Sequence, residues 1–188
     1  MAHRICPWWL GYLLVSPLRR LYQDPNAILT PHVRPGMTVI EIGPGMGFFT
    51  LDIARMIGPS GRVVAIDVQP RMIRTLERRA KRAGLLERIE TRLVQPEKSG
   101  MEDLDGRADF VLAFAVVHEL PGESAFFASA ARALKPGGRL FLAEPKGHVT
   151  ADDFATTLDA AASAGLAAID RPAVRRSHAA LLEKRSSR

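Results

Sequence analysis

The sequence predicts an α/β fold with a doubly wound, mostly parallel sheet of seven strands and helices on both faces. Short β-branched or apolar runs alternate with amphipathic segments from Thr38 onward, which is typical of a parallel sheet covered by helices. A glycine-rich turn joins the first of these runs to the segment that follows. The length of 188 residues suits one domain. We expect that domain to consist of a helical lid over residues 1–33 and a core over residues 34–188.

The lid is predicted from residues 7–22, which have the pattern of an amphipathic helix, and from residues 24–29, which begin with Asp-Pro. An Asp N-cap followed by a first-turn proline is a common helix start. The apolar stretch 7–15 is shorter than the ~20 residues that cross a bilayer. Arg19 and Arg20 follow it in place of a small-residue cleavage site. We therefore expect neither a membrane span nor a signal peptide.

The core is predicted to alternate strands and helices. Apolar or β-branched runs assign the parallel strands to residues 38–42, 62–66, 89–94, 110–117 and 139–143. Amphipathic segments assign helices to residues 48–57, 70–83, 121–134 and 150–165. Thr150 and Asp153 resemble a capping box at the start of the last helix. Two short strands, at 167–170 and 178–182, are expected to close the chain.

A glycine-rich loop follows the first strand of the core. Gly43, Gly45 and Gly47 allow a tight turn and a close approach of the backbone to a ligand. Their spacing is Gly-x-Gly-x-Gly, whereas the dinucleotide fingerprint would place its third glycine at Phe48. Glu41 lies just before the loop, and its carboxylate would repel phosphates. The loop therefore suits a ligand that carries an ammonium and a sulfonium group.

A second acid strengthens this interpretation. Asp67 ends the second strand of a Rossmann-like unit, near the ~20-residue spacing at which an acid binds ribose hydroxyls. The loop, the acid before it and the acid after the next strand together are a stronger indication than the loop alone. The alternative is that the glycines only form a turn and that Asp67 only caps the next helix.

Two later segments extend the pattern: Val117-His118-Glu119-Leu120-Pro121 and Leu134-Lys135-Pro136-Gly137-Gly138-Arg139-Leu140. With the loop and Asp67, they resemble the class I S-adenosylmethionine-dependent methyltransferases, over residues 35–142. The resemblance is greatest to the small-molecule branch that includes ubiquinone and menaquinone biosynthesis enzymes. It implies S-adenosylmethionine as cofactor and methyl transfer to a small-molecule acceptor. It also implies cofactor-binding roles for Glu41, Gly43, Pro44, Gly45, Gly47, Asp67 and Val68.

The adenine contact departs from the family pattern. The family usually has an Asp after the third strand that meets the adenine amino group. Here the region reads Val94-Gln95-Pro96-Glu97. Gln95 or Glu97 could accept the same hydrogen bond, and we take Gln95 as the candidate.

The candidate catalytic groups follow the fourth and fifth strands: His118, Glu119, Glu144 and His148. By resemblance these strands are neighbours, so the four groups are expected to line one pocket beneath the lid. His118 titrates near neutrality and could act as a general base; the alternative is a histidine without a catalytic duty. The spacing of the four groups is not diagnostic of a metal site, and none is predicted. Candidate substrate-binding residues are Trp8, Trp9 and Tyr12 in the lid, and Lys146 for an acidic substrate.

Charge leaves two alternatives open. The net charge is +6, and basic segments favour a nucleic-acid methyltransferase. These segments contain Arg71, Arg74, Arg78, Arg79, Lys81, Arg82, Arg171, Arg175, Arg176, Lys184 and Arg185. Against that alternative, no Asn/Asp-Pro-Pro-Tyr-type segment follows the fourth strand, and Cys6 is misplaced for a cytosine C5 enzyme. A non-catalytic cofactor-binding protein is the other alternative.

The cysteine content bears on the location of the protein. As the one cysteine, Cys6 cannot form an internal disulfide, which fits a cytoplasmic location.

Overall fold

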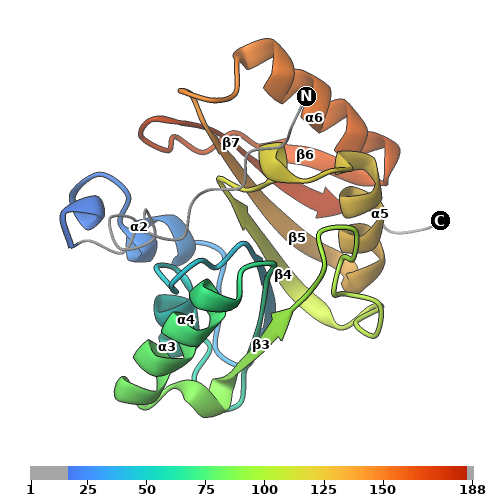
Figure 1. Ribbon diagram of the computed structural model, residues 1–188. Coiled ribbons are helices and arrows are strands. Elements are labelled where there is room, and N and C mark those ends of the chain that lie inside the picture. The colour runs from blue at the N-terminus through green and yellow to red at the C-terminus, as the bar shows by residue number, and fades with distance from the viewer. Residues whose placement is uncertain (1–16, 186–188) are drawn as a thin grey trace. The chain divides into compact units, whose positions relative to one another are not determined.

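The computed structural model describes residues 17–185 (Figure 1). These residues divide into two compact units, one ending at Gln95 and the other beginning at Pro96. The predicted lid residues Trp8, Trp9 and Tyr12 lie outside the described residues. Among residues 17–185 no helix combines the length and the apolar character that crossing a bilayer requires.

The first unit contains three parallel strands in the order β3-β2-β1. Its elements are η1 (Pro17–Leu21), α2 (Pro25–Leu29), β1 (Thr38–Ile42), α3 (Thr50–Met56), β2 (Arg62–Asp67), α4 (Pro70–Arg82), η2 (Leu86–Arg88) and β3 (Ile89–Leu93). The register pairs Ile42 with Ile66, and Asp67 with Leu93. Helix α3 packs against β2, and α4 packs against β2 and β3 (Figure 1). The ends of β1 and β2 are thereby fixed side by side, and both are followed by predicted cofactor residues.

Local chemistry explains how the helices of this unit begin and pack. The side chain of Asp24 accepts a hydrogen bond from Asn26 N (3.0 Å), as predicted for an N-cap before a first-turn proline. Helix α4 buries an apolar stripe at helical spacing, consisting of Met72, Ile73, Leu76 and Ala80. The helix predicted over residues 7–22 is wrong at its described end, where residues 17–21 form a 3₁₀ turn. Arg19 O accepts from the amides of Tyr22 and Gln23, which closes the turn there.

The second unit contains four strands in the order β4-β5-β7-β6. Its elements are β4 (Ala108–Phe114), η3 (Val117–Glu119), α5 (Glu123–Ala133), β5 (Leu134–Pro145), α6 (Ala151–Ser163), β6 (Leu166–Asp170) and β7 (Ser177–Lys184). Strands β4 and β5 are parallel, and β7 runs antiparallel to both β5 and β6. Helices α5 and α6 lie side by side and pack against β5 and β6, respectively (Figure 1). The capping box of Thr150 and Asp153 is present in both of its hydrogen bonds.

The seven strands and their helices confirm the predicted α/β class with a mostly parallel arrangement. Several predicted boundaries are shifted, and two strand boundaries are wrong by three residues or more. The strand expected to reach Val117 ends at Phe114, because Ala115 has a φ of 57° and turns the chain out of the extended conformation. Strand β5 begins at Leu134, before the expected turn, because a register shift lets Leu134 pair with Ala108 while Arg139 pairs with Phe110.

Candidate cofactor and acceptor sites

The glycine-rich loop leaves β1 in a conformation that side chains rarely adopt. Gly43, Gly45 and Gly47 have φ values of 64°, 55° and 83°. A Cβ on Gly47 would lie 2.4 Å from Leu76 Cδ1, so the loop packs closely on α4 at this point. A Cβ on Gly45 would meet nothing within 4 Å. Gly45 therefore leaves space beside the backbone, as a loop that receives a ligand requires.

Glu41 is buried on β1, with 3% of its surface exposed. Among residues 17–185, its Oε2 has no hydrogen-bond partner within normal distance and angle, and neither has the buried hydroxyl of Thr50. Burial raises the pKa of Glu41 to about 8, and the charge of nearby Asp67 adds to this effect, whereas the neighbouring Thr50 side chain and the charge of Arg19 act in the opposite direction. A buried carboxylate with an unbonded oxygen is costly, and a donor carrying positive charge would relieve that cost. This acid therefore fits the methionine ammonium group of S-adenosylmethionine.

Asp67 turns its carboxylate toward the glycine-rich loop. Its Oδ2 accepts a hydrogen bond from Gly45 N (3.2 Å), and its Oδ1 accepts one from Gln69 N (2.8 Å). The first bond links the ends of β1 and β2, and the second lies at the start of α4. Asp67 thus bonds the backbone at the start of α4 and also lies beside the loop, where a ribose-binding acid is expected.

Two arginines at this site were missed by sequence reasoning. Arg79 of α4 donates a hydrogen bond to Met46 O and so holds the loop. The guanidinium of Arg19 lies over the ring of Phe48, 4.2 Å from its centroid. Burial lowers the pKa of Arg19 to about 10. Both contacts join residues far apart in the sequence, so no local sequence motif predicts them.

The remaining predicted cofactor residues flank the loop or follow a strand. Pro44 is buried within the loop, and Val68 is half-buried just after β2. Gln95 and Glu97 are both exposed after β3. Because both side chains are exposed, their exposure does not show which of them contacts adenine, and the adenine contact stays a prediction.

The four candidate catalytic groups meet in the second unit. Nδ1 of His118 is hydrogen-bonded to Oε2 of Glu144. Nε2 of His118 lies 3.9 Å from Oε1 of Glu119. The rings of His118 and His148 are stacked, with centroids 5.7 Å apart and an interplanar angle of 13°. Residues from η3, from β5 and from the loop after β5 therefore converge on one imidazole. Glu144, expected to follow the fifth strand, lies within it, because β5 extends to Pro145. The catalytic roles of these residues stay predictions.

Glu144 differs from the other three groups because it is buried. Only 1% of its side chain is exposed, compared with 24% for His118. Its Oε1 accepts from Val116 N (3.3 Å) and Val117 N (2.8 Å). The Glu144 carboxylate is thus surrounded by donors of its own chain. Among residues 17–185 no group of three or more His, Cys, Asp or Glu side chains is arranged to hold a metal ion.

Lys146, the predicted contact for an acidic substrate, is exposed. Its backbone N–H donates to Arg176 O (3.0 Å), which fixes the loop after β5 to the segment before β7. No ion pair of its ammonium group is recorded among the described residues. A role in substrate binding therefore stays a prediction.

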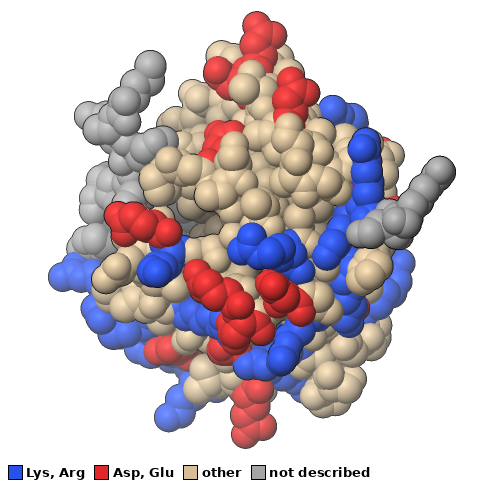
Figure 2. Space-filling view, turned by 90° about the vertical axis from the view of Figure 1, so that its right-hand side faces the viewer, with Lys and Arg blue, Asp and Glu red and all other residues tan. Residues whose placement is uncertain are grey.

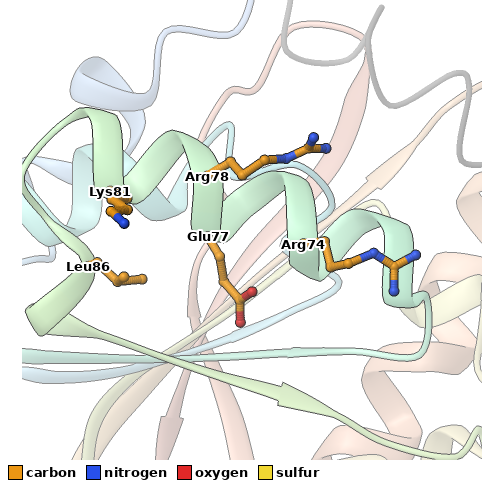
Figure 3. Close-up of a pocket in the computed structure, with 5 residues that line it drawn as sticks. All are labelled: Arg74, Glu77, Arg78, Lys81 and Leu86. Atoms are coloured by element: carbon orange, nitrogen blue, oxygen red, sulfur yellow. The ribbon is translucent and has the colours of Figure 1, made fainter.

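A separate hollow lies on the outer face of α4. It is lined by Arg74, Glu77, Arg78, Lys81 and Leu86 (Figure 3). Glu77 lies between the cations and accepts a hydrogen bond from the hydroxyl of Thr91 (2.6 Å). Figure 2 shows acidic side chains interspersed with basic ones on the face it presents. The basic residues counted in the sequence therefore do not form one uninterrupted cationic surface on that face.

Comparison with known proteins identifies the family. A family model described as a methyltransferase domain matches residues 39–138, which is more than half of the chain. The ribosomal protein L11 methyltransferase of Pelotomaculum thermopropionicum is 37% identical over 60% of this chain and 34% of its own length. The ubiquinone biosynthesis O-methyltransferase of a Methylobacterium species is 30% identical over 76% of this chain and 53% of its own length. The chain thus spans about a third to a half of these relatives.

A solved structure gives the same answer for the fold. The crystal structure of a SAM dependent methyltransferase from Aquifex aeolicus superposes with a TM-score of 0.85. It is 23% identical, and the match covers 96% of this chain and 100% of that one. The chain therefore belongs to the methyltransferase domain family and has the Rossmann-like fold of the class I S-adenosylmethionine-dependent methyltransferases. The family predicted from the sequence is confirmed.

Proposed function

We propose that this chain transfers the methyl group of S-adenosylmethionine to a small-molecule acceptor. The observation that carries the proposal is Glu41, a buried acid whose Oε2 has no hydrogen-bond partner among residues 17–185 and which lies just before a loop with three glycines of positive φ. Such a carboxylate is stabilised by a cationic ligand and destabilised by a phosphate. This property favours S-adenosylmethionine over a dinucleotide.

The roles of the other residues follow from their places around the loop. Glu41, Gly43, Pro44, Gly45 and Gly47 would hold the methionine part of the cofactor. Asp67 and Val68 would hold the ribose, and Gln95 the adenine. When bound, the cofactor supplies an electrophilic methyl group on sulfur. The protein must orient the acceptor in line with that group and remove a proton where the acceptor carries one.

The small-molecule acceptor is supported by the relative that shares the larger part of this chain, the ubiquinone biosynthesis O-methyltransferase. The relative with the higher identity acts, by its name, on a ribosomal protein. A nucleic-acid acceptor has one observation in its favour, the cationic hollow on α4. Glu77 among those cations would repel a phosphate chain, which weighs against that acceptor.

The test is a binding and turnover experiment on the full chain. Isothermal titration calorimetry should show binding of S-adenosylhomocysteine and S-adenosylmethionine, with NAD binding weakly or not at all. A screen that measures S-adenosylhomocysteine release should then find turnover with a small acceptor. Tight NAD binding without a response to S-adenosylhomocysteine would overturn the proposal. Cofactor binding without turnover of any acceptor class would favour a non-catalytic binding protein.

A further inference from the structure

The buried carboxylate of Glu144 is bonded on both of its oxygens by its own chain. Its Oε1 accepts from the amides of Val116 and Val117, and its Oε2 is bonded to Nδ1 of His118. A carboxylate only accepts hydrogen bonds. The proton of this pair therefore lies on Nδ1, and neutral His118 carries its lone pair on Nε2.

The ring of His118 is held by more than this bond. The imidazole of His148 stacks on it with an interplanar angle of 13°. Both the tautomer and the plane of His118 are thus set before a substrate arrives. The side chain keeps 24% of its surface exposed. A basic nitrogen in a fixed orientation with access to solvent is the arrangement that a general base requires.

The backbone beside His118 is strained to build this arrangement. Ala115 has a φ of 57°, a left-handed conformation that is energetically unfavourable for a non-glycine residue. Its amide donates to Ala143 O (2.7 Å), which anchors the turn to β5. The turn at Ala115 then aims the next two amides at Glu144. Strain of this kind persists where the surrounding structure enforces it, and it is concentrated at functional sites.

Acidic groups from three elements surround the imidazole. Glu144 comes from β5, Glu119 from η3, and Glu123 from α5. The hydrogen bond with Glu144 is the main cause that raises the pKa of His118 above its ordinary value of 6.5, while burial acts in the opposite direction. Glu119, 3.9 Å from Nε2, would stabilise an imidazolium after it has taken a proton. His178, the register partner of Glu144 on β7, stacks on Phe154 instead.

We propose that His118 is the general base of methyl transfer, that Glu144 positions it, and that the acceptor is an oxygen acid such as a phenol or enol. This inference rests on the proposed function and names the substrate class of the same site. The acceptor O–H gives its proton to Nε2 of His118 as the oxygen electron pair forms a bond to the methyl carbon. The C–S bond breaks with its pair passing to sulfur, and the imidazolium then releases the proton to solvent.

The choice of an oxygen acid follows from acidity. A phenol with a pKa near 10 is almost wholly protonated at neutral pH, so it needs a base in the transition state. A thiol with a pKa of about 8.5 ionises readily by itself. A neutral amine attacks with its own lone pair and loses its proton afterwards. Of these three acceptors, the oxygen acid therefore depends most on a pre-oriented imidazole.

The first arm of the test compares two probes, phenol and 4-nitrophenol, the second of which is largely ionised at pH 8. His118→Gln should lower kcat for phenol by about 10²- to 10⁴-fold and leave 4-nitrophenol almost unaffected. His178→Gln, a histidine of the same unit outside the cluster, is the matched control and should retain the wild-type rate. Equal losses for both probes, or no loss for either, would overturn the base role. Methylation of an amine or thiol but of neither phenol would overturn the acceptor class while leaving the proposed function intact.

The second arm needs no turnover. Imidazole ¹⁵N spectra of the ligand-free full chain should show His118 protonated on Nδ1, with a titration midpoint above 6.5. In Glu144→Gln the tautomers should mix and the midpoint should fall, whereas Glu144→Asp should restore both in part. The kcat/KM profile for phenol should move with that midpoint. An unchanged tautomer and midpoint in Glu144→Gln would overturn the positioning role, whatever the rate.

Discussion

Two buried glutamates, one in each unit, differ in how many hydrogen bonds their carboxyl groups accept. Glu41 on β1 and Glu144 on β5 are 3% and 1% exposed. Within the described range 17–185, Glu41 has an oxygen without a hydrogen-bond partner, and burial raises its pKa to about 8. Glu144 is bonded by two backbone amides and by His118. Two glutamates that are buried to a similar extent therefore differ in hydrogen bonding: one oxygen of Glu41 is unbonded, whereas both oxygens of Glu144 are bonded.

The difference separates two uses of a buried charge. A carboxylate that its own chain satisfies can fix the geometry of a neighbour, because its bonds are formed in the folded state. A carboxylate that is left unsatisfied destabilises the free protein and gains from a ligand that brings a donor. We infer that Glu41 faces the cofactor and that Glu144 acts through His118.

The largest expected effect concerns the loop that places Glu41 beside its ligand. Gly45→Val should weaken binding of S-adenosylhomocysteine by more than about 100-fold, because a β-branched residue resists a φ of 55° and fills the space at the loop. Gly58→Val is the matched control, since Gly58 has a φ of 67° and equally open space but lies outside the loop. Calorimetry with both variants decides the point. Equal effects of the two variants would show that strain alone matters and that the loop is not the cofactor site.

The next effect compares the two glutamates directly. Glu41→Gln should weaken binding of S-adenosylhomocysteine by about 10- to 100-fold, the loss expected for one hydrogen bond between charged groups. Glu144→Gln should leave that affinity within about 2-fold, because its oxygens serve the second unit. The measurement is a dissociation constant for each variant at pH 8. A larger loss in Glu144→Gln than in Glu41→Gln would reverse the assignment.

The stability of the ligand-free protein should depend on pH through Glu41. Its pKa is raised from 4.5 to about 8, so between these values the folded protein holds a proton that the unfolded chain has lost. Stability should therefore fall as pH rises from 4.5 toward 8, by up to about 1.4 kcal/mol per pH unit. Glu41→Gln should lack this component and exceed the wild type near pH 8. Urea unfolding at a series of pH values tests it, and parallel curves for both proteins would exclude a titrating Glu41.

The smallest effect concerns the charged surface of α4, where substitutions should affect cofactor binding less than a substitution of Glu41 does. Binding of duplex or structured RNA should be weak, indifferent to sequence and steeply reduced by salt. Replacing Arg74, Arg78 and Lys81 by Ala should lower the salt dependence without changing cofactor affinity. Filter binding at several salt concentrations measures both. Salt-resistant and sequence-selective binding would instead favour a nucleic-acid acceptor.

The sequence predicted the fold because its signals were local. Runs such as Thr38–Ile42 are apolar and β-branched, and the structure has a strand with those bounds. The Asp24-Pro25 start and the Thr150–Asp153 capping box are also written in adjacent residues, and both are confirmed. The end of β4 was misplaced because the apolar run continues past Phe114 to Val117. The hydrogen bonds at Ala115 and Glu144, which join residues far apart in the sequence, hold the turn there.

The candidate sites were predictable in their residues but not in their connections. The sequence put Glu144 among groups that line a pocket, and the structure places it behind His118 with its oxygens occupied. Which acid would be left without a partner could not be read from motifs, because it depends on donors brought from other elements. The contact of Arg79 with Met46 O likewise joins α4 to the loop across 33 residues. Trp8, Trp9 and Tyr12 stay predictions.

The unpartnered oxygen of Glu41 also makes the cofactor compete with the proton. With a pKa of about 8 in the ligand-free protein, this acid is mostly protonated at neutral pH. An arriving ammonium group would favour the ionised form, so uptake of the cofactor should expel a proton. Calorimetry in two buffers of different ionisation enthalpy would count that proton, and identical heats would show that none leaves. Occupancy of the cofactor site should then rise as the pH increases up to about 8. The amount of cofactor bound at a given concentration would therefore depend on the pH around the protein.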